Sequence, residues 1–208
     1  MTVTLYGSPV SPYVRASRTA FAEKNVDYDF VPIGPTELRE PDYVKRHPFR
    51  KLPSLDVNGT RVFETSAILR FIDEAHPGDV QLQPSDALAR AHCEQWLSAA
   101  NSYIYDASFT GLFFQRALAP QFNIPVDEDL IASSIKRTRD CLAAVSDALA
   151  LEELDRYDTP TLADLLVGAN LVLLEQIEEG QSELSEAPAV RDWLERLSAR
   201  PSFTSTAA

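Results

Sequence analysis

The stretch of sequence that decides the fold is HPFRKLPSLDVNGTRVFETSAI, residues 47–68. Two short runs of alternating residues, 54–57 and 61–64, flank Asn58-Gly59, a dipeptide that tolerates the positive φ angles of a tight hairpin turn. From Thr65 onward, apolar residues recur with the spacing of one helix face: Ile68, Phe71, Ile72 and Ala75. This stretch therefore predicts a β-hairpin followed directly by an amphipathic helix.

The residues before this stretch predict a βαβ unit. In a first strand, Val3 and Leu5 point to the same side of a sheet. Ser11-Pro12 then opens a helix that extends to about Lys24, because Ser is a favoured N-cap and Pro fits the first helical position. A second strand is expected at about residues 28–33. Since a helix joins the two strands, they should run parallel.

The second half of the chain is predicted to be all-helical. No convincing strand pattern follows residue 84, and apolar residues recur with helical spacing over long stretches. Thr161 and Asp164 have the spacing of a capping box, and a last helix is expected to end at Pro201. We therefore expect an N-terminal domain of residues 1–76, a linker of residues 77–85 and a helical C-terminal domain of residues 86–208.

The composition argues against several classes of function. With 19 basic and 31 acidic side chains, the formal net charge is −12, which repels nucleic-acid backbones and anionic lipid surfaces. The N-terminus lacks the features of a secretory signal, and no apolar run approaches the roughly 20 residues of a membrane span. A cytoplasmic location is expected. Cys93 and Cys141 are expected to be reduced core residues, and neither a metal-ligand spacing nor a nucleotide-binding loop is present, so no metal and no nucleotide cofactor is expected.

The order of these elements, together with several short motifs, resembles the cytosolic glutathione transferases. HPFRKLPSL at 47–55 is similar to the family's NPxGKVPxL, ETSAI at 64–68 to its ESxAI, and PTLADLL at 160–166 to its FSLADI. The ending at 190–203 resembles the family's last helix. The resemblance implies an α/β thioredoxin-like domain followed by an all-α domain, glutathione as co-substrate, and a homodimer. The serine-type, bacterial-like members are the ones that the chain resembles in particular.

Ser11 is the catalytic candidate. The chemistry of the family requires a thiolate, since only the deprotonated thiol is a good nucleophile. Ser11 stands between the first strand and the first helix, where its hydroxyl can donate to the glutathione sulfur and nearby amides add positive potential. Taken alone, Ser-Pro is more typical of a simple helix cap, but a hydroxyl can accept and donate at once. Tyr6 is the rival, since other classes of the family use a tyrosine at the end of the first strand.

The resemblance also implies which residues bind the rest of glutathione. Pro53 corresponds to the cis-proline of the thioredoxin-like fold, so that Leu52 offers its backbone N–H and C=O to the cysteinyl part and Lys51 reaches the glycyl carboxylate. Thr65 and the amides at the start of its helix would bind the γ-glutamyl carboxylate, and Glu64 the ammonium group. Without the family context, Lys51 is a surface lysine, Thr65 an N-cap and Glu64 an acid that complements the helix dipole.

One departure from the family pattern concerns a short polar helix expected at residues 37–46. Many serine-type members carry a histidine or lysine three residues before a Pro-x-Tyr step, whereas Pro41-Asp-Tyr43 is preceded here by Leu38, with Arg39 and Arg46 nearby. The departure leaves open whether this helix contacts the glycyl carboxylate.

The second substrate is expected in a pocket lined by Tyr13, after the first strand, and by Tyr105, Phe109 and Phe113 on the first long helix. Core packing is the alternative for most of these rings. The leading prediction is a glutathione transferase that conjugates glutathione to a hydrophobic electrophile. Two alternatives stay open: a glutathione-dependent isomerase or dehalogenase, and a non-catalytic binding protein of the same fold.

Overall fold

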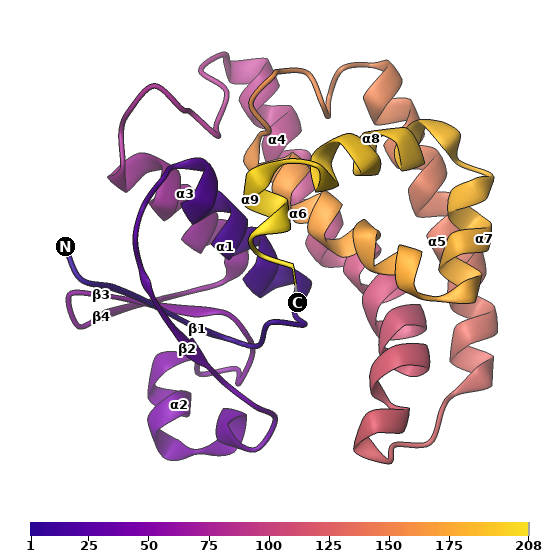
Figure 1. Ribbon diagram of the computed structural model, residues 1–208, viewed down its shortest axis with the longest axis horizontal. Coiled ribbons are helices and arrows are strands. Elements are labelled where there is room, and N and C mark those ends of the chain that lie inside the picture. Colours follow the sequence, from indigo (N-terminus) through magenta and orange to yellow (C-terminus); the bar gives the residue numbers. More distant parts are fainter. Residues whose placement is uncertain (208) are drawn as a thin grey trace. The chain divides into compact units, whose positions relative to one another are not determined.

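The computed structural model describes residues 1–207, whose contacts form two compact units. The first unit comprises Met1–Gln83 together with the residues from Pro201 onward, and the second comprises Pro84–Arg200. Figure 1 shows a sheet covered by helices in the first unit and helices alone in the second. The predicted fold class, an α/β domain followed by an all-α domain, is confirmed.

The sheet of the first unit has the strand order β2-β1-β3-β4. Its strands are β1 (Val3–Gly7), β2 (Asp29–Pro32), β3 (Ser54–Val57) and β4 (Thr60–Phe63). β1 pairs in parallel with β2 and antiparallel with β3, which forms a hairpin with β4, so the predicted βαβ unit and hairpin are both confirmed. At the turn, Asn58 and Gly59 have φ angles of 50° and 83°, the positive values that this dipeptide tolerates.

Helices cover both faces of this sheet (Figure 1). α1 (Pro12–Glu23) and α3 (Thr65–Ala75) pack together over the face to which Leu5 points, and Leu5 is fully buried there. A Cβ atom on Gly7 would collide with the Val14 side chain, so α1 approaches β1 as closely as a glycine permits. The opposite face is covered by α2 (Pro41–Arg46), whose Arg46 guanidinium lies 4.1 Å from the ring centroid of Tyr6.

The short helix expected at residues 37–46 is divided in two. A single 3₁₀ turn, η1 (Glu37–Arg39), is separated from α2 by Glu40, which is extended with φ −68° and ψ 141°. The residue before a proline is pushed out of the helical region by the proline ring, and Pro41 follows Glu40. The expectation of one continuous helix was therefore wrong at this position.

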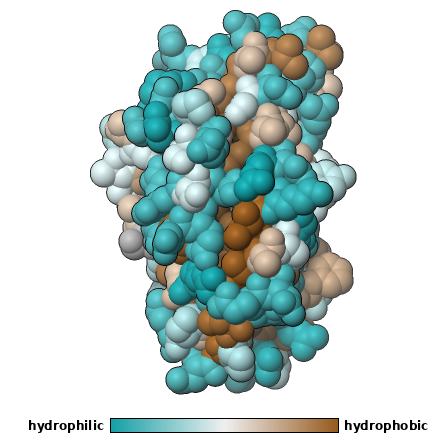
Figure 2. All heavy atoms as spheres, turned by 90° about the vertical axis from the view of Figure 1, so that its right-hand side faces the viewer, coloured by the Kyte–Doolittle hydropathy of each residue, from teal (hydrophilic) through white to brown (hydrophobic). Residues whose placement is uncertain are grey.

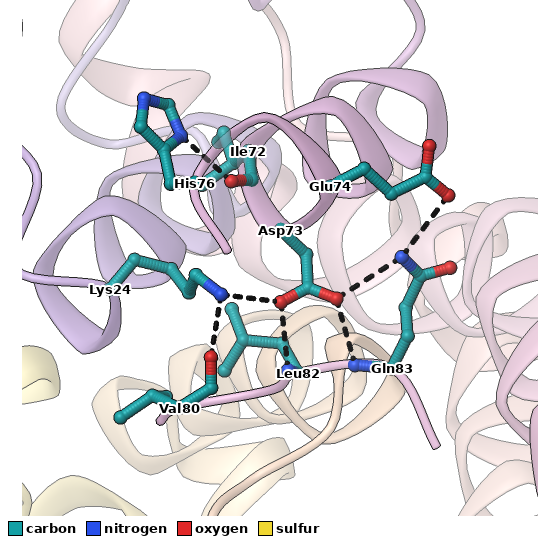
Figure 3. A network of polar contacts seen from close by, with 8 residues as sticks. All are labelled: Lys24, Ile72, Asp73, Glu74, His76, Val80, Leu82 and Gln83. Atoms are coloured by element: carbon teal, nitrogen blue, oxygen red, sulfur yellow. Dashed lines mark hydrogen bonds and ion pairs between the residues drawn. The ribbon is translucent and has the colours of Figure 1, made fainter. Parts of the chain in front are cut away.

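A buried ion pair joins the end of α1 to α3. The Lys24 ammonium lies 2.9 Å from Oδ1 of Asp73, and the two side chains are 3% and 8% exposed. The Asp73 carboxylate also accepts hydrogen bonds from the backbone amides of Leu82 and Gln83 (Figure 3). A single carboxylate on α3 thus fixes both the end of α1 and the segment that leaves the first unit.

The second unit is built around a fully buried helix. Its elements are α4 (Ala87–Ala99), the π-helical continuation η2 (Ala100–Leu118), η3 (Pro120–Phe122), α5 (Glu128–Ala150), α6 (Leu162–Leu171), η4 (Val172–Gln176), α7 (Glu178–Ser185) and α8 (Pro188–Ser198). All ten residues of α6 are buried. The predicted capping box is confirmed: Thr161 Oγ1 accepts from the Asp164 amide, and the Asp164 carboxylate accepts from the Thr161 amide. Because all α6 residues other than Asp164 and Asn170 are apolar, the helix can form the centre of this unit.

The outer helices of the second unit are amphipathic. On the face shown in Figure 2, hydrophilic side chains dominate and hydrophobic ones appear mainly as a narrow strip. The apolar positions of α5, such as Ile131 and Leu142, are buried. A Cβ atom on Gly111 of η2 would collide with Ser134 of α5, so these two helices also cross at close range. None of the helices that the structure describes is long and apolar enough to cross a membrane.

The structure of the residues after α8 differs from what the sequence predicted. Pro201 follows the last helix, as predicted, but it also begins a further short helix, α9 (Pro201–Thr204). α9 packs on α1: Arg15 donates to the Phe203 carbonyl, and the Thr19 and Thr206 hydroxyls lie 3.0 Å apart. These last residues therefore pack with the first unit, whereas the sequence had grouped them with the helical domain.

Candidate active site

Three chain segments meet at one end of the sheet in the first unit. The register pairs Tyr6 of β1 with Ser54 of β3, and Ser54 with Phe63 of β4. β1 therefore ends where β3 begins and where β4 ends. α1 starts shortly after β1, and α3 directly after β4. Ser11, the segment Lys51–Pro53 and the pair Glu64-Thr65, which are far apart in the sequence, are consequently brought to the same end of the sheet.

Ser11 is the N-cap of α1. Its Oγ accepts a hydrogen bond from the Val14 amide at 3.4 Å, and its backbone is extended with φ −79° and ψ 124°. The side chain is half-buried. The capping role expected from the Ser-Pro pair is present. The hydroxyl acts as the acceptor in this bond, so its proton is free to be donated to a further partner.

Tyr6, the rival donor, packs on the other side of the sheet. Residues alternate along β1, and Tyr6 faces α2 rather than α1. The guanidinium that covers its ring belongs to Arg46, which also forms an ion pair with Asp56 at 3.3 Å. A cation placed this close to a tyrosine ring is a stabilising contact, so Tyr6 has a packing partner of its own. Arg39, the other arginine near α2, is exposed.

The segment Lys51–Pro53 precedes β3. The Leu52–Pro53 peptide bond is cis, as the resemblance implied. Leu52 is half-buried, and within residues 1–207 its backbone N–H and C=O take part in no backbone hydrogen bond. The Lys51 side chain is exposed, and its carbonyl accepts a hydrogen bond from the Tyr43 hydroxyl at 2.7 Å. Leu52 thus presents one free backbone donor and one free acceptor, as an added strand requires.

No side chain caps the start of α3. Thr65 is the first helical residue and is 6% exposed, while Glu64 occupies the N-cap position without a capping hydrogen bond. Thr65 is therefore not an N-cap, the simpler role considered for it. A side chain caps α1, α4, α5 and α6, whereas α2, α7 and α8 begin, like α3, without one. Amides at an uncapped helix start attract anions. Glu64 has φ 72°, an uncommon value for a non-glycine residue and one often found at functional sites.

Sequence reasoning missed two buried residues that support this end of the sheet. Tyr43 is 4% exposed, and burial raises the pKa of its hydroxyl to about 12. His47 is 2% exposed, and its ring centroid lies 5.1 Å from that of Phe63. α2 has six residues, too few to show a helical periodicity that would mark either side chain as buried. The Pro-x-Tyr step was the available signal for Tyr43.

Of the residues predicted to line the second-substrate pocket, Tyr13 lies in the first unit, and Tyr105, Phe109 and Phe113 lie in the second. Tyr13 is half-buried in the first turn of α1. Along η2, the ring centroids of Tyr105 and Phe109 are 4.9 Å apart in a stacked arrangement, and those of Phe109 and Phe113 are 5.8 Å apart. Phe113 is 4% exposed and belongs to the core, whereas Tyr105 and Phe109 are half-buried. Burial also raises the pKa of Tyr105 to about 12, so its hydroxyl stays protonated.

The two cysteines lie in the second unit, away from Ser11 in the sequence. Neither forms a disulfide; Cys93 is buried and Cys141 half-buried, and burial raises the pKa of the Cys141 thiol. In the part of the chain that the structure describes, no three His, Cys, Asp or Glu side chains are grouped to hold a metal ion.

A βαβ-ββα domain with a cis-proline beside its first helix, followed by an all-helical unit, defines a thioredoxin-like protein with a helical extension. Residues 5–80 match the family described as "Glutathione S-transferase, N-terminal domain". Glutathione S-transferase 3 of Zea mays is 31% identical over 98% of this chain and 92% of its own length. Glutathione transferase F2 from Populus trichocarpa has a solved structure that superposes with a TM-score of 0.88 at 28% identity, covering 98% of this chain and 96% of that one.

The chain therefore belongs to the glutathione S-transferase family. This membership confirms the predicted glutathione transferase and its use of glutathione. A further relative, glutathione S-transferase F10 of Arabidopsis thaliana, is 27% identical over 100% of this chain and 97% of its own length. These relatives are plant proteins, so they give no support to the bacterial-like subtype that we expected.

Proposed function

We propose that this chain conjugates the thiolate of glutathione to a hydrophobic electrophile and that Ser11 is the hydroxyl that stabilises the thiolate. The observation that carries the proposal is the position of Ser11, which begins α1 at the end of the sheet that also holds Leu52 and the uncapped start of α3. A thiol bound there meets both a hydroxyl donor and the amide end of a helix. In this sense the enzyme would be of the serine type.

One hydrogen bond from the Ser11 hydroxyl would be strong enough to ionise the bound thiol at neutral pH. A free thiol has a pKa of about 8.5 and is mostly protonated at neutral pH. One charge-assisted hydrogen bond contributes about 1.5–3 kcal/mol, which corresponds to about one to two pKa units. Ser11 Oγ would donate its proton to the sulfur while it continues to accept from the Val14 amide, so the helix cap does not have to break. The bound thiol would then be largely ionised at neutral pH.

The remaining parts of glutathione have matching groups in the same unit. The free N–H and C=O of Leu52 would pair with the cysteinyl residue as an added strand does. Lys51 is exposed and would reach the glycyl carboxylate. The uncapped amides beside Thr65 would bind the γ-glutamyl carboxylate, and the exposed Glu64 would bind the adjacent ammonium group. Both signs of charge lie within two consecutive residues, as recognition of a zwitterion requires.

The electrophile would bind against aromatic side chains. The stacked, half-buried rings of Tyr105 and Phe109 offer an apolar surface on η2, and the buried Phe113 packs against Phe109. Tyr13, in the first turn of α1, stays a predicted contributor. An aromatic surface favours a hydrophobic electrophile over the small polar substrates of an isomerase or a dehalogenase.

We also propose a cytoplasmic homodimer. Phe49, two residues before Lys51, leaves 66% of its surface exposed beside the proposed glutathione site. Its ring lies 6.1 Å from that of Phe63, so it projects from an ordered aromatic pair. A second copy of the chain would cover this ring. The formal charge of −12 suits a protein that avoids anionic membranes and nucleic acids.

The test is the ultraviolet difference spectrum of bound glutathione against pH, measured for the wild type, Ser11→Gly and Ser11→Thr. Gly is a tolerated N-cap, so Ser11→Gly removes the hydroxyl at a cost of a few tenths of a kcal/mol in helix stability. We expect a thiolate band well below the pKa of the free thiol in the wild type and in Ser11→Thr. The band should be absent at neutral pH in Ser11→Gly.

Turnover of an activated aryl chloride, such as chlorodinitrobenzene, completes the test. Conjugation in the wild type and its loss in Ser11→Gly would support the transferase assignment. If glutathione binds to every variant but its thiol pKa is never lowered, the catalytic role of Ser11 is wrong and a binding protein is the better description.

A further inference from the structure

The α9 segment (residues 201–207) packs along one face of α1, the helix that begins after Ser11. Side chains of α1 meet this segment at three places. The paired residues are Arg15 with Phe203, Thr19 with Thr206, and Glu23 with Ser202. Positions four residues apart lie on the same side of a helix. The α9 segment therefore holds a single face of α1 from its first turn to its last residue.

The contact nearest to Ser11 joins Arg15 to Phe203, which lies 188 residues further along the chain. The central carbon of the Arg15 guanidinium is 5.3 Å from the centroid of the Phe203 ring, and Nη2 of Arg15 donates to the Phe203 carbonyl at 3.3 Å. Phe203 is fully buried and Arg15 is half-buried. A guanidinium that stacks on a ring and also donates a hydrogen bond is fixed in direction as well as in distance.

Ser11 accepts hydrogen bonds from two consecutive backbone amides. The Val14 amide donates to its Oγ at 3.4 Å, and the Arg15 amide donates to its carbonyl at 2.9 Å. The Val14 side chain is fully buried and lies so close to Gly7 of β1 that a Cβ atom there would collide with it. The Arg15 side chain is held by Phe203. The two residues that fix Ser11 are thus anchored separately, one by the sheet and the other by the α9 segment.

We propose that Phe203 is a positioning residue for the transferase reaction, because it acts through Arg15 on the place of the Ser11 hydroxyl. The inference rests on the proposed function, in which Ser11 Oγ donates to the glutathione sulfur. A hydrogen bond weakens steeply when its angle leaves the optimum, and a misplacement of about 1 Å can cost about 100-fold in rate. The other proposed contacts to glutathione, at Lys51–Pro53 and at the start of α3, come from other segments. Loss of the anchor should therefore affect the sulfur and spare the rest of the ligand.

The experiment titrates bound glutathione by ultraviolet difference spectroscopy in the wild type and in Phe203→Leu, which keeps an apolar side chain but removes the ring that Arg15 stacks on. We expect the thiol pKa to rise by about half a unit or more and kcat with chlorodinitrobenzene to fall about tenfold. The dissociation constant of S-methylglutathione, which has no thiol, should change less than about twofold, since its other contacts are kept.

Thr206→Val is the matched control. Thr206 is also buried in the α9 segment, but its hydroxyl meets Thr19, in the second half of α1. The substitution removes a buried hydrogen bond, so it should lower the melting temperature without shifting the thiol pKa. A rise of the thiol pKa in Thr206→Val as large as in Phe203→Leu would mean that the α9 segment only supports the fold, and the positioning role of Phe203 would be refuted.

Arg15→Gln tests the same contact from the other side, and its half-buried position keeps the test valid if Phe203→Leu does not fold. The thiol pKa should rise as in Phe203→Leu, and the double variant should show no larger rise, because both substitutions break one contact. A wild-type pKa in either single variant, or effects that add, would contradict the proposal. If the thiol pKa is not lowered even in the wild type, the proposed function itself fails.

Discussion

Tyr43 donates a hydrogen bond from its hydroxyl to the backbone carbonyl of Lys51, with a distance of 2.7 Å between the two oxygen atoms. The donor belongs to α2, and the acceptor lies in the segment that precedes the cis Leu52–Pro53 bond. Because Tyr43 is 4% exposed, water does not readily replace this bond. The orientation of the Lys51–Leu52 peptide, which is central to the proposed glutathione site, therefore depends on a neighbouring helix.

Tyr43→Phe should weaken glutathione binding more than it weakens catalysis. The substitution keeps the ring but leaves the Lys51 carbonyl without its partner, which should lower the free energy of unfolding by about 1–3 kcal/mol. We expect KM for glutathione to rise several-fold with kcat nearly unchanged, measured by steady-state kinetics. Tyr28→Phe is the matched control, since Tyr28 stacks on Phe21 through its ring. Equal effects of the two substitutions would contradict the role given to Tyr43.

Tyr6→Phe should leave the ionisation of bound glutathione unchanged. The Tyr6 ring faces α2 and is covered by Arg46, a contact that a phenylalanine ring also provides. The thiolate band of bound glutathione, followed by ultraviolet difference spectroscopy, should titrate at the same pH as in the wild type. A rise of the thiol pKa by a unit or more in Tyr6→Phe would transfer the activating role from Ser11 to Tyr6.

Asp73→Asn should destabilise the protein at neutral pH and less so in acid. Burial by itself would raise the pKa of Asp73, but hydrogen bonds from Leu82, Lys24 and Gln83 lower it overall (Figure 3). A carboxyl whose folded-state pKa lies below the unfolded value of about 3.9 stabilises the fold above that pH. This stabilisation is lost as the pH falls through the folded-state pKa.

At neutral pH, Asp73→Asn leaves Lys24 as a buried, unpaired cation, which should lower the free energy of unfolding by about 3–5 kcal/mol. Urea unfolding at neutral pH and near pH 3 measures both values, and the difference between variant and wild type should narrow in acid. Asp42→Asn is the control, because Asp42 and its partner Lys45 are largely exposed and their pair should contribute nothing measurable. An equal loss at both pH values would contradict the assigned charge of Asp73.

Phe49→Ser should convert the proposed homodimer into monomers. An exposed aromatic ring at the centre of an interface is often a hot spot, and its removal costs 2 kcal/mol or more of binding energy, roughly 30-fold in the dissociation constant. Light scattering coupled to size-exclusion chromatography at micromolar concentrations measures the mass. Leu151→Ser is the control, since Leu151 is 70% exposed at the end of α5. If wild type and Phe49→Ser have the same mass, this interface is wrong.

Local signals in the sequence predicted much of the fold. The Asn58-Gly59 turn, the Ser11-Pro12 helix start and the Thr161–Asp164 capping box each formed as expected. Each depends on the backbone preferences of a few consecutive residues or on one hydrogen bond across a single helical turn. Such signals can be read without knowing the rest of the structure. The break of the 37–46 helix before Pro41 could also have been predicted from the sequence, because a proline disfavours the helical conformation of the residue before it. We overlooked this signal.

The sequence by itself determined the element types, because turns, caps and apolar periodicity act over short distances. Its motifs also carried the family resemblance, and that resemblance implied Ser11, Lys51–Pro53 and Glu64-Thr65 as candidate site residues. The tertiary structure alone decided that Tyr6 packs under Arg46, that Tyr43 holds the Lys51 carbonyl, and that the residues after Pro201 pack on α1. These contacts join side chains from separate elements. Their existence depends on strand register and helix packing, which a local pattern does not encode.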